Sequence, residues 1–189
     1  MGAAVILVIG GVRSGKSRFA QQVATDLSQG GGVRFVATAK LDLADRSMAT
    51  RIGEHRRKRP SHWETAEAPL DLGDAITGHH GAPAPAVVLV DCLTLWLTNL
   101  MEAAGDVAQA GFAEQARAGL EIGAASLLAA LRDAPQPVVI VTNEVGSGVA
   151  PATSLGNIFA DLQGELNQAV AKEAGAVYHV VAGIGTRIK

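Results

Sequence analysis

Phosphate-binding chemistry is indicated by residues 10–17, whose sequence is GGVRSGKS. This stretch fits the P-loop pattern G-x-x-x-x-G-K-[ST], in which backbone N–H groups and the start of a helix surround phosphate oxygens. Lys16 is expected to reach the β- and γ-phosphates, and the Ser17 hydroxyl to bind Mg²⁺. The alternative is a glycine-rich turn that matches by accident. An apolar run at 3–9 and a helical pattern after the loop favour a nucleotide site formed by Gly10, Gly11, Val12, Arg13, Ser14, Gly15, Lys16 and Ser17.

Two carboxylates follow apolar runs further along the chain. Asp91 comes directly after the run at 86–90, in the position of a Walker B aspartate that holds Mg²⁺, usually through water. The alternative for Asp91 is an ordinary helix N-cap, and the P-loop upstream favours the metal role. Glu144 follows the run at 138–142 and could act as a general base or orient water. A structural hydrogen bond is an equally good interpretation of Glu144.

A basic segment at 51–60, RIGEHRRKRP, places four cations directly after His55. These cations are Arg56, Arg57, Lys58 and Arg59. One interpretation is a solvated basic helix end, because cations are favourable near a helix C-terminus. The other is an anion site, because guanidinium groups bind phosphate oxygens bidentately and an imidazole can act as a nucleophile on phosphorus. The remaining histidines show no metal-ligand spacing, so no zinc site is predicted.

Strand and helix patterns alternate along the chain. Apolar runs predict strands at 3–9, 33–37, 86–90, 138–142, 176–181 and 184–189, with a short extended piece at 63–69. Helices are predicted at 18–29, 45–57, 70–76, 93–101, 112–131 and 154–174. This alternation is typical of an α/β fold with a mostly parallel sheet covered by helices on both faces.

Ligands of such sheets bind beyond the carboxyl ends of the strands. Four segments bring polar residues to that edge: the P-loop, residues 38–40, Asp91, and the pair Asn143 and Glu144. We therefore expect a single site along this edge.

Composition narrows the class of protein. A chain of 189 residues with 48% hydrophobic and 18% charged residues predicts one globular domain. The net charge of −2 gives no support to electrostatic capture of nucleic acid or of an anionic membrane. One cysteine, Cys92, leaves no internal disulfide and suits a reducing cytoplasm. No apolar stretch approaches the ~20 residues of a membrane span.

Motifs spread over the whole chain resemble those of one family. They are the P-loop with Arg18, V-A-T-A at 36–39, M-x-x-R-I-x-x-H at 48–55, R-P-x-x-W-x-T-x-E at 59–67, D-C-L-T at 91–94, T-N-L at 98–100, V-T-N-E-V-G-x-G-x-x-P at 141–151, G-x-x-N-Q at 164–168 and V-A-G-I at 181–184. The chain is similar to the bifunctional adenosylcobinamide kinase/adenosylcobinamide-phosphate guanylyltransferases of cobalamin biosynthesis. The blocks around His55 and at 143–146 are much more specific than the P-loop.

The resemblance implies a RecA-like P-loop NTPase fold, a three-layer sandwich, over residues 1–189. It implies that ATP or GTP phosphorylates adenosylcobinamide, with Mg²⁺ as cofactor. GTP then transfers GMP to His55, and adenosylcobinamide phosphate attacks that adduct to give adenosylcobinamide-GDP. It places further nucleotide contacts at Ala37, Thr38, Ala39, Arg56, Arg57, Lys58, Arg59 and Glu67, with Glu67 reading guanine. Family members form ring-like homo-oligomers.

The chain departs from the family pattern at four places. Arg46-Ser47 stands where relatives have an acidic pair, and cations common in relatives are replaced by Ser154, Asn157 and Ala160. These changes bear on corrinoid affinity and on the kinase half, whereas the guanylyl-transfer residues match. Two other functions stay open on the residues alone: a P-loop kinase of another small alcohol, and a nucleotide-gated binding protein.

Overall fold

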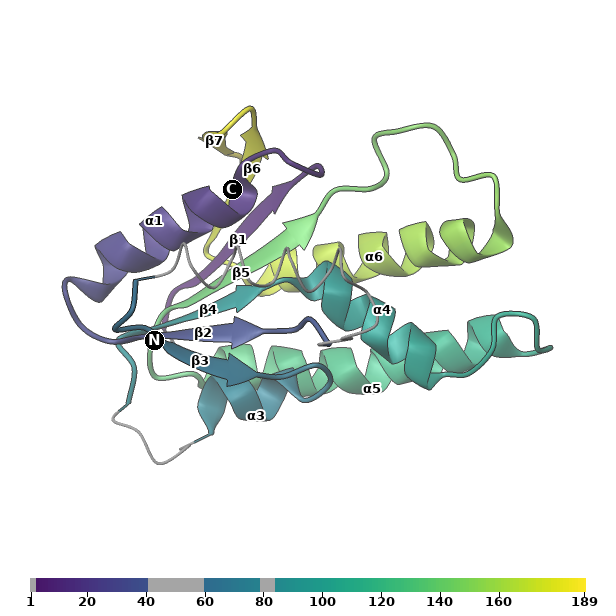
Figure 1. Cartoon of the computed structure of the whole chain (residues 1–189), viewed down its shortest axis with the longest axis horizontal. Coiled ribbons are helices and arrows are strands. Elements are labelled where there is room, and N and C mark those ends of the chain that lie inside the picture. Colours follow the sequence, from purple (N-terminus) through teal and green to yellow (C-terminus); the bar gives the residue numbers. More distant parts are fainter. Residues whose placement is uncertain (1–2, 41–59, 79–83) are drawn as a thin grey trace.

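A computed structural model describes residues 3–40, 60–78 and 84–189. Its centre is a seven-stranded sheet in the order β3-β2-β4-β5-β1-β6-β7 (Figure 1). The strands are β1 (Val5–Gly10), β2 (Val33–Ala37), β3 (Glu64–Glu67), β4 (Val87–Asp91), β5 (Val138–Asn143), β6 (Ala176–Val181) and β7 (Ile184–Arg187). Every neighbouring pair is parallel except β6 with β7, which is antiparallel. The mostly parallel sheet predicted from the sequence is confirmed.

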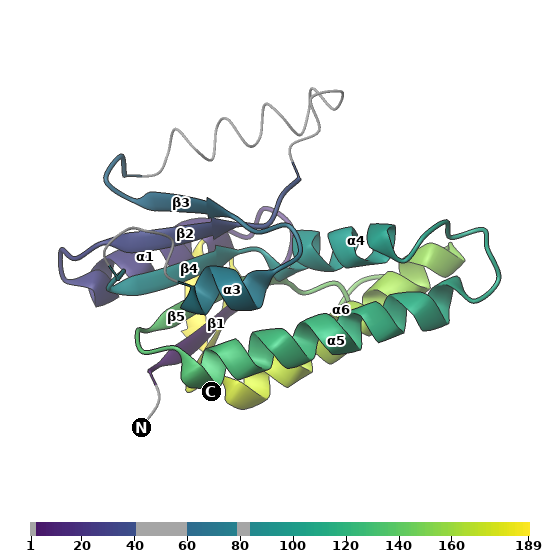
Figure 2. The ribbon, with the colours of Figure 1, turned by 90° about the horizontal axis from the view of Figure 1, so that it is seen from below.

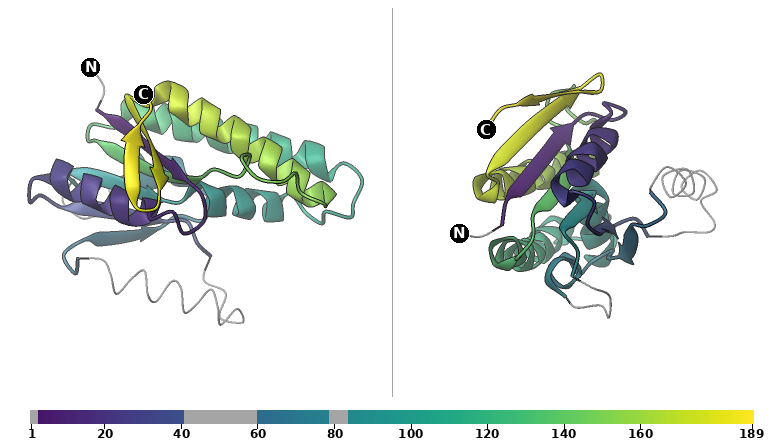
Figure 3. Two further views of the ribbon diagram at one scale, coloured as in Figure 1. Left: turned by 90° about the horizontal axis from the view of Figure 1, so that it is seen from above. Right: turned by 90° about the vertical axis from the view of Figure 1, so that its left-hand side faces the viewer.

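Helices cover both faces of the sheet. They are α1 (Lys16–Ser28), α3 (Leu72–Thr77), α4 (Leu93–Ala103), α5 (Phe112–Asp133) and α6 (Ser154–Glu173). Helix α1 lies against one face, and α5 and α6 run side by side along the other (Figures 2 and 3). The described part of the chain therefore forms three layers.

Two hydrophobic clusters, one on each face, explain the continuous apolar strands. Val8, Val141 and Leu89 pack toward Ala20 and Ala24 of α1 in one cluster. Residues of opposite parity in the same strands pack with α4, α5 and α6 in the other. Because side chains alternate across a strand, a sheet buried on both faces needs apolar residues at every position. The same alternation fixes which face each polar residue at the strand ends will meet.

The last two strands form a tight hairpin. Ala182 and Gly183 join β6 to β7, and both have positive φ, 51° and 81°. Two consecutive left-handed residues match the right-handed twist of a two-residue hairpin. The terminal strand expected at 184–189 is therefore present as β7 and runs antiparallel to its neighbour.

The other predicted elements are found with small shifts at their ends. Helix α1 begins at Lys16 rather than Arg18, and α3 begins at Leu72 rather than Leu70. The helix predicted at 45–57 lies outside the described residues. Among the helices that the structure describes, none has the length and apolar character needed to cross a membrane.

Candidate active site at the carboxyl edge of the sheet

The carboxyl ends of β1, β2, β4 and β5 lie along one edge of the sheet. Gly10 is the register partner of Asn143, and Asp91 is the partner of both Ala37 and Val141. The phosphate loop therefore lies at the same edge as Thr38, Asp91 and Asn143, as the sequence predicts.

The phosphate loop, residues 10–17, connects the end of β1 to the start of α1. Gly15 caps the helix with φ 91° and carries no side chain that could satisfy the first N–H groups. Those N–H groups and the positive end of the helix dipole form an anion site. A Cβ at Gly10 would lie 2.5 Å from the Val180 carbonyl oxygen, so only glycine fits there.

Lys16 folds back over this loop. Its Nζ donates a hydrogen bond to the Gly11 carbonyl oxygen at 3.1 Å. Burial lowers the pKa of the Lys16 ammonium, and the negative charge of Asp91 opposes that shift. Because burial disfavours the charged ammonium, the negative charge of an incoming phosphate would stabilise it. Ser17 follows in the first turn of α1, where the sequence predicts a metal ligand.

Asp91 is the last residue of β4. It stands two residues beyond Leu89 and therefore lies on the same face of the sheet, the face that carries α1. The N-cap of α4 is Cys92, so the alternative of Asp91 as that helix's N-cap is wrong. A hydroxyl at Ser17 and a carboxylate at Asp91 are hard oxygen donors. Such a pair suits Mg²⁺, which keeps several waters and takes phosphate oxygens for its other positions. Among the described residues no cluster of three or more His, Cys, Asp or Glu side chains is arranged to hold a metal.

Thr38 is fully buried, and its hydroxyl joins β2 to β4. Thr38 Oγ1 donates to the Cys92 carbonyl oxygen at 2.8 Å and accepts from the Cys92 N–H at 2.9 Å. Asn99 of α4 donates to the carbonyl oxygens of Thr38 and Pro69, at 2.7 Å and 2.9 Å. The Thr38 side chain thus positions the start of α4. Contacts of Ala37, Thr38 and Ala39 with a nucleotide stay predictions.

Cys92 is a buried free cysteine next to Asp91. Burial and, to a lesser extent, the Asp91 charge raise the pKa of its thiol to about 11. The thiol therefore stays protonated near neutral pH and is a poor nucleophile.

Glu144 begins the connection from β5 to α6. Its N–H donates to the Gly10 carbonyl oxygen at 3.1 Å, and its Oε1 accepts from the Gly146 N–H at 2.5 Å. The structural hydrogen bond considered for Glu144 is therefore present, and a catalytic role stays a prediction.

Glu67 ends β3 at the opposite side of the sheet from β7 and pairs in register with Ala37. It lines a groove of about 460 Å³ along β3 and α3 that also includes Thr65, Pro69 and Asp74. The predicted contact of Glu67 with guanine is compatible with this exposed position.

The basic segment lies outside the described residues. His55, Arg56, Arg57, Lys58 and Arg59 are among the residues that the structure does not describe, and so is the Arg46-Ser47 departure. Their roles remain predictions.

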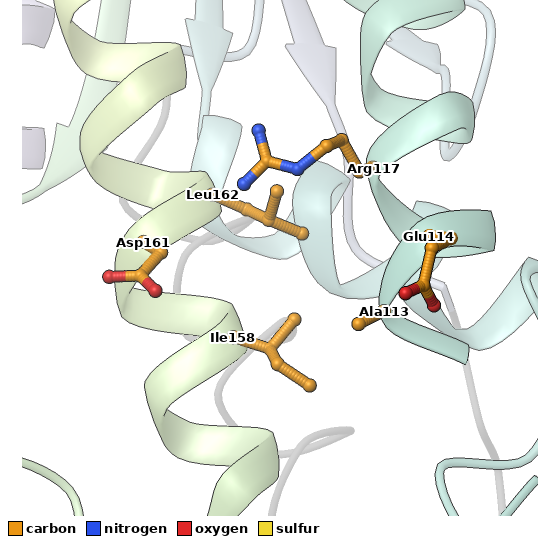
Figure 4. Close-up of a pocket in the computed structure, with 6 residues that line it drawn as sticks. All are labelled: Ala113, Glu114, Arg117, Ile158, Asp161 and Leu162. Atoms are coloured by element: carbon orange, nitrogen blue, oxygen red, sulfur yellow. The ribbon is translucent and has the colours of Figure 1, made fainter. Parts of the chain in front are cut away.

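A smaller cavity of about 210 Å³ is lined by residues of α5 and α6. Ala113, Glu114 and Arg117 line it from α5, and Ile158, Asp161 and Leu162 from α6 (Figure 4). Arg117 already pairs with Glu165 at 2.6 Å. The residues that line this cavity combine opposite charges with aliphatic side chains, and this mixture does not indicate one class of ligand.

Two features of the site were not anticipated from the residues. The turn between β6 and β7 contacts the phosphate loop, since the Gly183 N–H donates to the Ser14 carbonyl oxygen at 2.7 Å. Behind β5, Thr142, Gln163 and Asn167 form a buried hydrogen-bond network. The motifs at 141–151, 164–168 and 181–184 include residues at these places but do not show that they meet.

Comparison with known proteins finds relatives over nearly the whole chain. The family described as "Cobinamide kinase / cobinamide phosphate guanyltransferase" matches residues 6–188. The bifunctional adenosylcobalamin biosynthesis protein CobU of Escherichia coli (strain K12) is 41% identical over 187 residues, covering 98% of this chain and 99% of that protein. CobU of Salmonella typhimurium is 42% identical over 188 residues, with the same coverage. The bifunctional protein CobP of Pseudomonas aeruginosa is 40% identical over 183 residues, covering 97% of this chain and 96% of that protein.

Among solved structures, one described as an ATPase domain has a TM-score of 0.50 with this chain at 13% identity. The match covers 93% of this chain and 68% of that one. At this identity the likeness concerns the fold alone, and it confirms the predicted P-loop NTPase architecture.

Proposed function

Since the chain belongs to the cobinamide kinase/cobinamide phosphate guanyltransferase family, we propose that it is a bifunctional enzyme of cobalamin biosynthesis and that one phosphate loop serves both of its reactions. The first reaction phosphorylates adenosylcobinamide with ATP or GTP. The second transfers GMP from GTP to adenosylcobinamide phosphate through His55. The observation that carries the proposal is the meeting of the loop, Lys16 and Asp91 at one edge of the sheet.

The phosphate loop and the start of α1 bind the triphosphate. The N–H groups that Gly15 leaves uncapped face the phosphate oxygens, and Lys16 turns from the Gly11 carbonyl toward the β- and γ-phosphates. Ser17 and Asp91 would hold Mg²⁺. Held there, the ion would supply positive charge against the negative charge that develops on the phosphate oxygens during transfer.

In the kinase reaction the aminopropanol hydroxyl of adenosylcobinamide attacks the γ-phosphorus. A new P–O bond forms, the bond to the nucleoside diphosphate breaks, and the hydroxyl proton leaves to a base. Lys16 stabilises the departing diphosphate oxygen, where the negative charge grows. No further covalent step is needed, because positioning and electrostatics supply most of the catalysis in phosphoryl transfer.

In the guanylyl-transfer reaction a neutral His55 nitrogen attacks the α-phosphorus of GTP. A P–N bond forms as the P–O bond to pyrophosphate breaks, and the loop with Lys16 retains the leaving pyrophosphate. A phosphate oxygen of adenosylcobinamide phosphate then attacks the same phosphorus, the P–N bond breaks, and the free imidazole returns. The covalent adduct divides one difficult transfer into two easier ones.

The remaining predicted contacts complete the nucleotide site. Arg56, Arg57, Lys58 and Arg59 would bind phosphate oxygens, Ala37, Thr38 and Ala39 would line the nucleotide, and Glu67 would accept hydrogen bonds from guanine donors. We further propose that the chain is one catalytic domain working in a homo-oligomer. In such an assembly His55 meets a nucleotide held partly by a neighbouring subunit.

The experiment that tests the function supplies adenosylcobinamide, GTP or ATP, and Mg²⁺, and follows products by mass spectrometry. The native protein should form adenosylcobinamide phosphate and then adenosylcobinamide-GDP. His55→Ala should stop at the phosphate, and Lys16→Met should form neither product. Phosphate without adenosylcobinamide-GDP in the native protein would leave a kinase alone. Nucleotide binding without any product would favour a nucleotide-gated binding protein.

A further inference from the structure

Asn143 occupies the centre of the carboxyl edge. It ends β5, which lies between β1 with the phosphate loop and β4 with Asp91. Asn143 is the register partner of Gly10 and stands two residues beyond Val141, the partner of Asp91. It therefore lies between the two groups that are expected to hold the phosphates and the metal.

The Asn143 side chain lies on the face of the sheet that carries the phosphate loop. The preceding residue, Thr142, points to the opposite face, where its hydroxyl donates to Asn167 of α6 at 2.7 Å. Val141 packs in the cluster that contains Ala20 and Ala24 of α1. Because successive side chains alternate, Asn143 shares the face of Val141 and of α1.

The backbone of Asn143 is held on both sides. Its N–H donates to Thr94 Oγ1 at 3.0 Å, and its carbonyl oxygen accepts from Asn167 Nδ2 at 3.0 Å. Gln163 in turn donates to Thr142 Oγ1 and Asn167 Oδ1, at 3.1 Å and 3.0 Å. This network is buried and spans β5, α4 and α6. The position of the Asn143 Cβ is therefore fixed by three elements.

The carboxamide oxygen of Asn143, in contrast, is unsatisfied within the described part of the chain. This Oδ1 is buried and finds no hydrogen-bond donor among those residues, whereas the backbone of Asn143 is fully bonded. A buried polar atom without a hydrogen-bond partner is destabilising. Ser14 Oγ is a second such atom, and an ideal Cβ on Gly10 would lie 2.7 Å from it. Two unsatisfied polar groups thus flank Gly10, at the mouth of the phosphate loop.

We propose that Asn143 is a contact for the γ-phosphate of the bound triphosphate, its carboxamide donating an N–H to a γ-phosphate oxygen. Because Oδ1 has no hydrogen-bond donor among the described residues, no contact there fixes the orientation of the amide, and rotation about the last side-chain bond can turn the N–H₂ group toward the loop. The proposal rests on the proposed function for the presence of a triphosphate. It adds a residue that distinguishes a triphosphate from a diphosphate.

A contact with the γ-phosphate should affect the kinase reaction and the guanylyl-transfer reaction differently. In the kinase step the γ-phosphoryl group itself moves, so the contact changes as the reaction proceeds. In guanylyl transfer the β- and γ-phosphates leave together and keep their contacts. Loss of the Asn143 amide should therefore lower the kinase rate more than the rate of guanylyl transfer.

Nucleotide binding gives the direct test and does not depend on the corrinoid. Calorimetry with Mg²⁺ would compare a non-hydrolysable triphosphate analogue with the diphosphate, in both guanosine and adenosine forms. Asn143→Ala should weaken binding of the triphosphate by about tenfold or more, as expected for the loss of a hydrogen bond to a charged group. It should weaken binding of the diphosphate by less than about twofold. Asn143→Asp, which keeps the shape but removes the donor and adds negative charge, should weaken the triphosphate at least as much. Gln115→Ala removes an exposed amide on α5 and should change neither affinity.

Thermal unfolding separates this role from a structural one. Asn143→Ala removes an unsatisfied polar group, so its Tm should stay at or above the native value. A lowered Tm with unchanged discrimination between triphosphate and diphosphate would overturn the proposal. Equal weakening of both nucleotides would overturn it too. A native protein that binds neither nucleotide would contradict the proposed function itself.

Discussion

The backbone N–H of Gly183 lies 2.7 Å from the carbonyl oxygen of Ser14, so the C-terminal hairpin is hydrogen-bonded to the phosphate loop. The two glycines at this contact are closely packed. A Cβ on Gly15 would come within 2.9 Å of the Gly183 Cα. The hairpin thus supports the loop from the side opposite to β5 and limits the conformations the loop can adopt. Binding energy is then not spent on ordering the loop.

Gly183→Ala should damage this support. Gly183 has φ 81°, and a Cβ there would lie 3.0 Å from Arg18 Nη2. We expect a loss of about 1–2 kcal/mol in the free energy of unfolding, from backbone strain, together with weaker nucleotide binding. Denaturant unfolding and calorimetry with GTP measure the two effects.

A matched control is Gly119→Ala in α5, where a Cβ would meet no atom within 4 Å. Alanine is the better helix former, so this variant should be more stable by about 0.5–1 kcal/mol and should bind GTP normally. If both variants bind GTP like the native protein, the hairpin does not support the loop.

Removal of Glu64 should destabilise the sheet more than removal of Arg34. Arg34 is only 2% exposed and pairs with Glu64 at 3.2 Å, while Glu64 is 32% exposed. Glu64→Ala leaves a buried guanidinium without its carboxylate, which costs about 3–5 kcal/mol when no charge compensates. Arg34→Met keeps the buried hydrocarbon and leaves a carboxylate that water can reach. Denaturant unfolding should rank Glu64→Ala as the less stable variant, and the reverse order would contradict this account of the pair.

Cys92 should resist alkylation in the folded protein. Burial, and then the Asp91 charge, raise the pKa of the thiol to about 11. A raised thiol pKa means that the neutral form is favoured, so stability from the buried thiol is present below its ordinary pKa of 9 and is lost as the pH rises toward 11. Iodoacetamide labelling at pH 7–8 should be slow in buffer and fast in denaturant. Fast labelling of the folded protein would show that the thiol is accessible or ionised.

Much of the fold follows from local patterns. The apolar runs at β1, β4 and β5 identify strands buried on both faces, and the loop at 10–17 fixes the direction of β1 and α1. The carboxyl-edge rule then places Asp91 and Asn143 beside the loop, before any contact is known.

Other features depend on contacts that leave no local pattern. Thr38 meets Cys92 across 54 residues of sequence, and Gly183 meets Ser14 through backbone groups. Backbone hydrogen bonds have no residue preference that a sequence reveals, and a buried threonine looks like any strand residue. In α1 the fully buried residues are Ala20 and Ala24, because small side chains let the helix approach the sheet. The apolar repeat of Phe19, Val23 and Leu27 lies only partly buried beside them.

The intact mass of the protein after incubation with GTP and Mg²⁺ shows whether the phosphate loop presents GTP to His55. We predict an acid-labile increment of the size of GMP in the native protein and in His62→Ala, a control that removes an exposed histidine of the described chain. His55→Ala should lack the increment. No increment in native protein that still binds GTP with Mg²⁺, or an increment that persists in His55→Ala, would contradict the account.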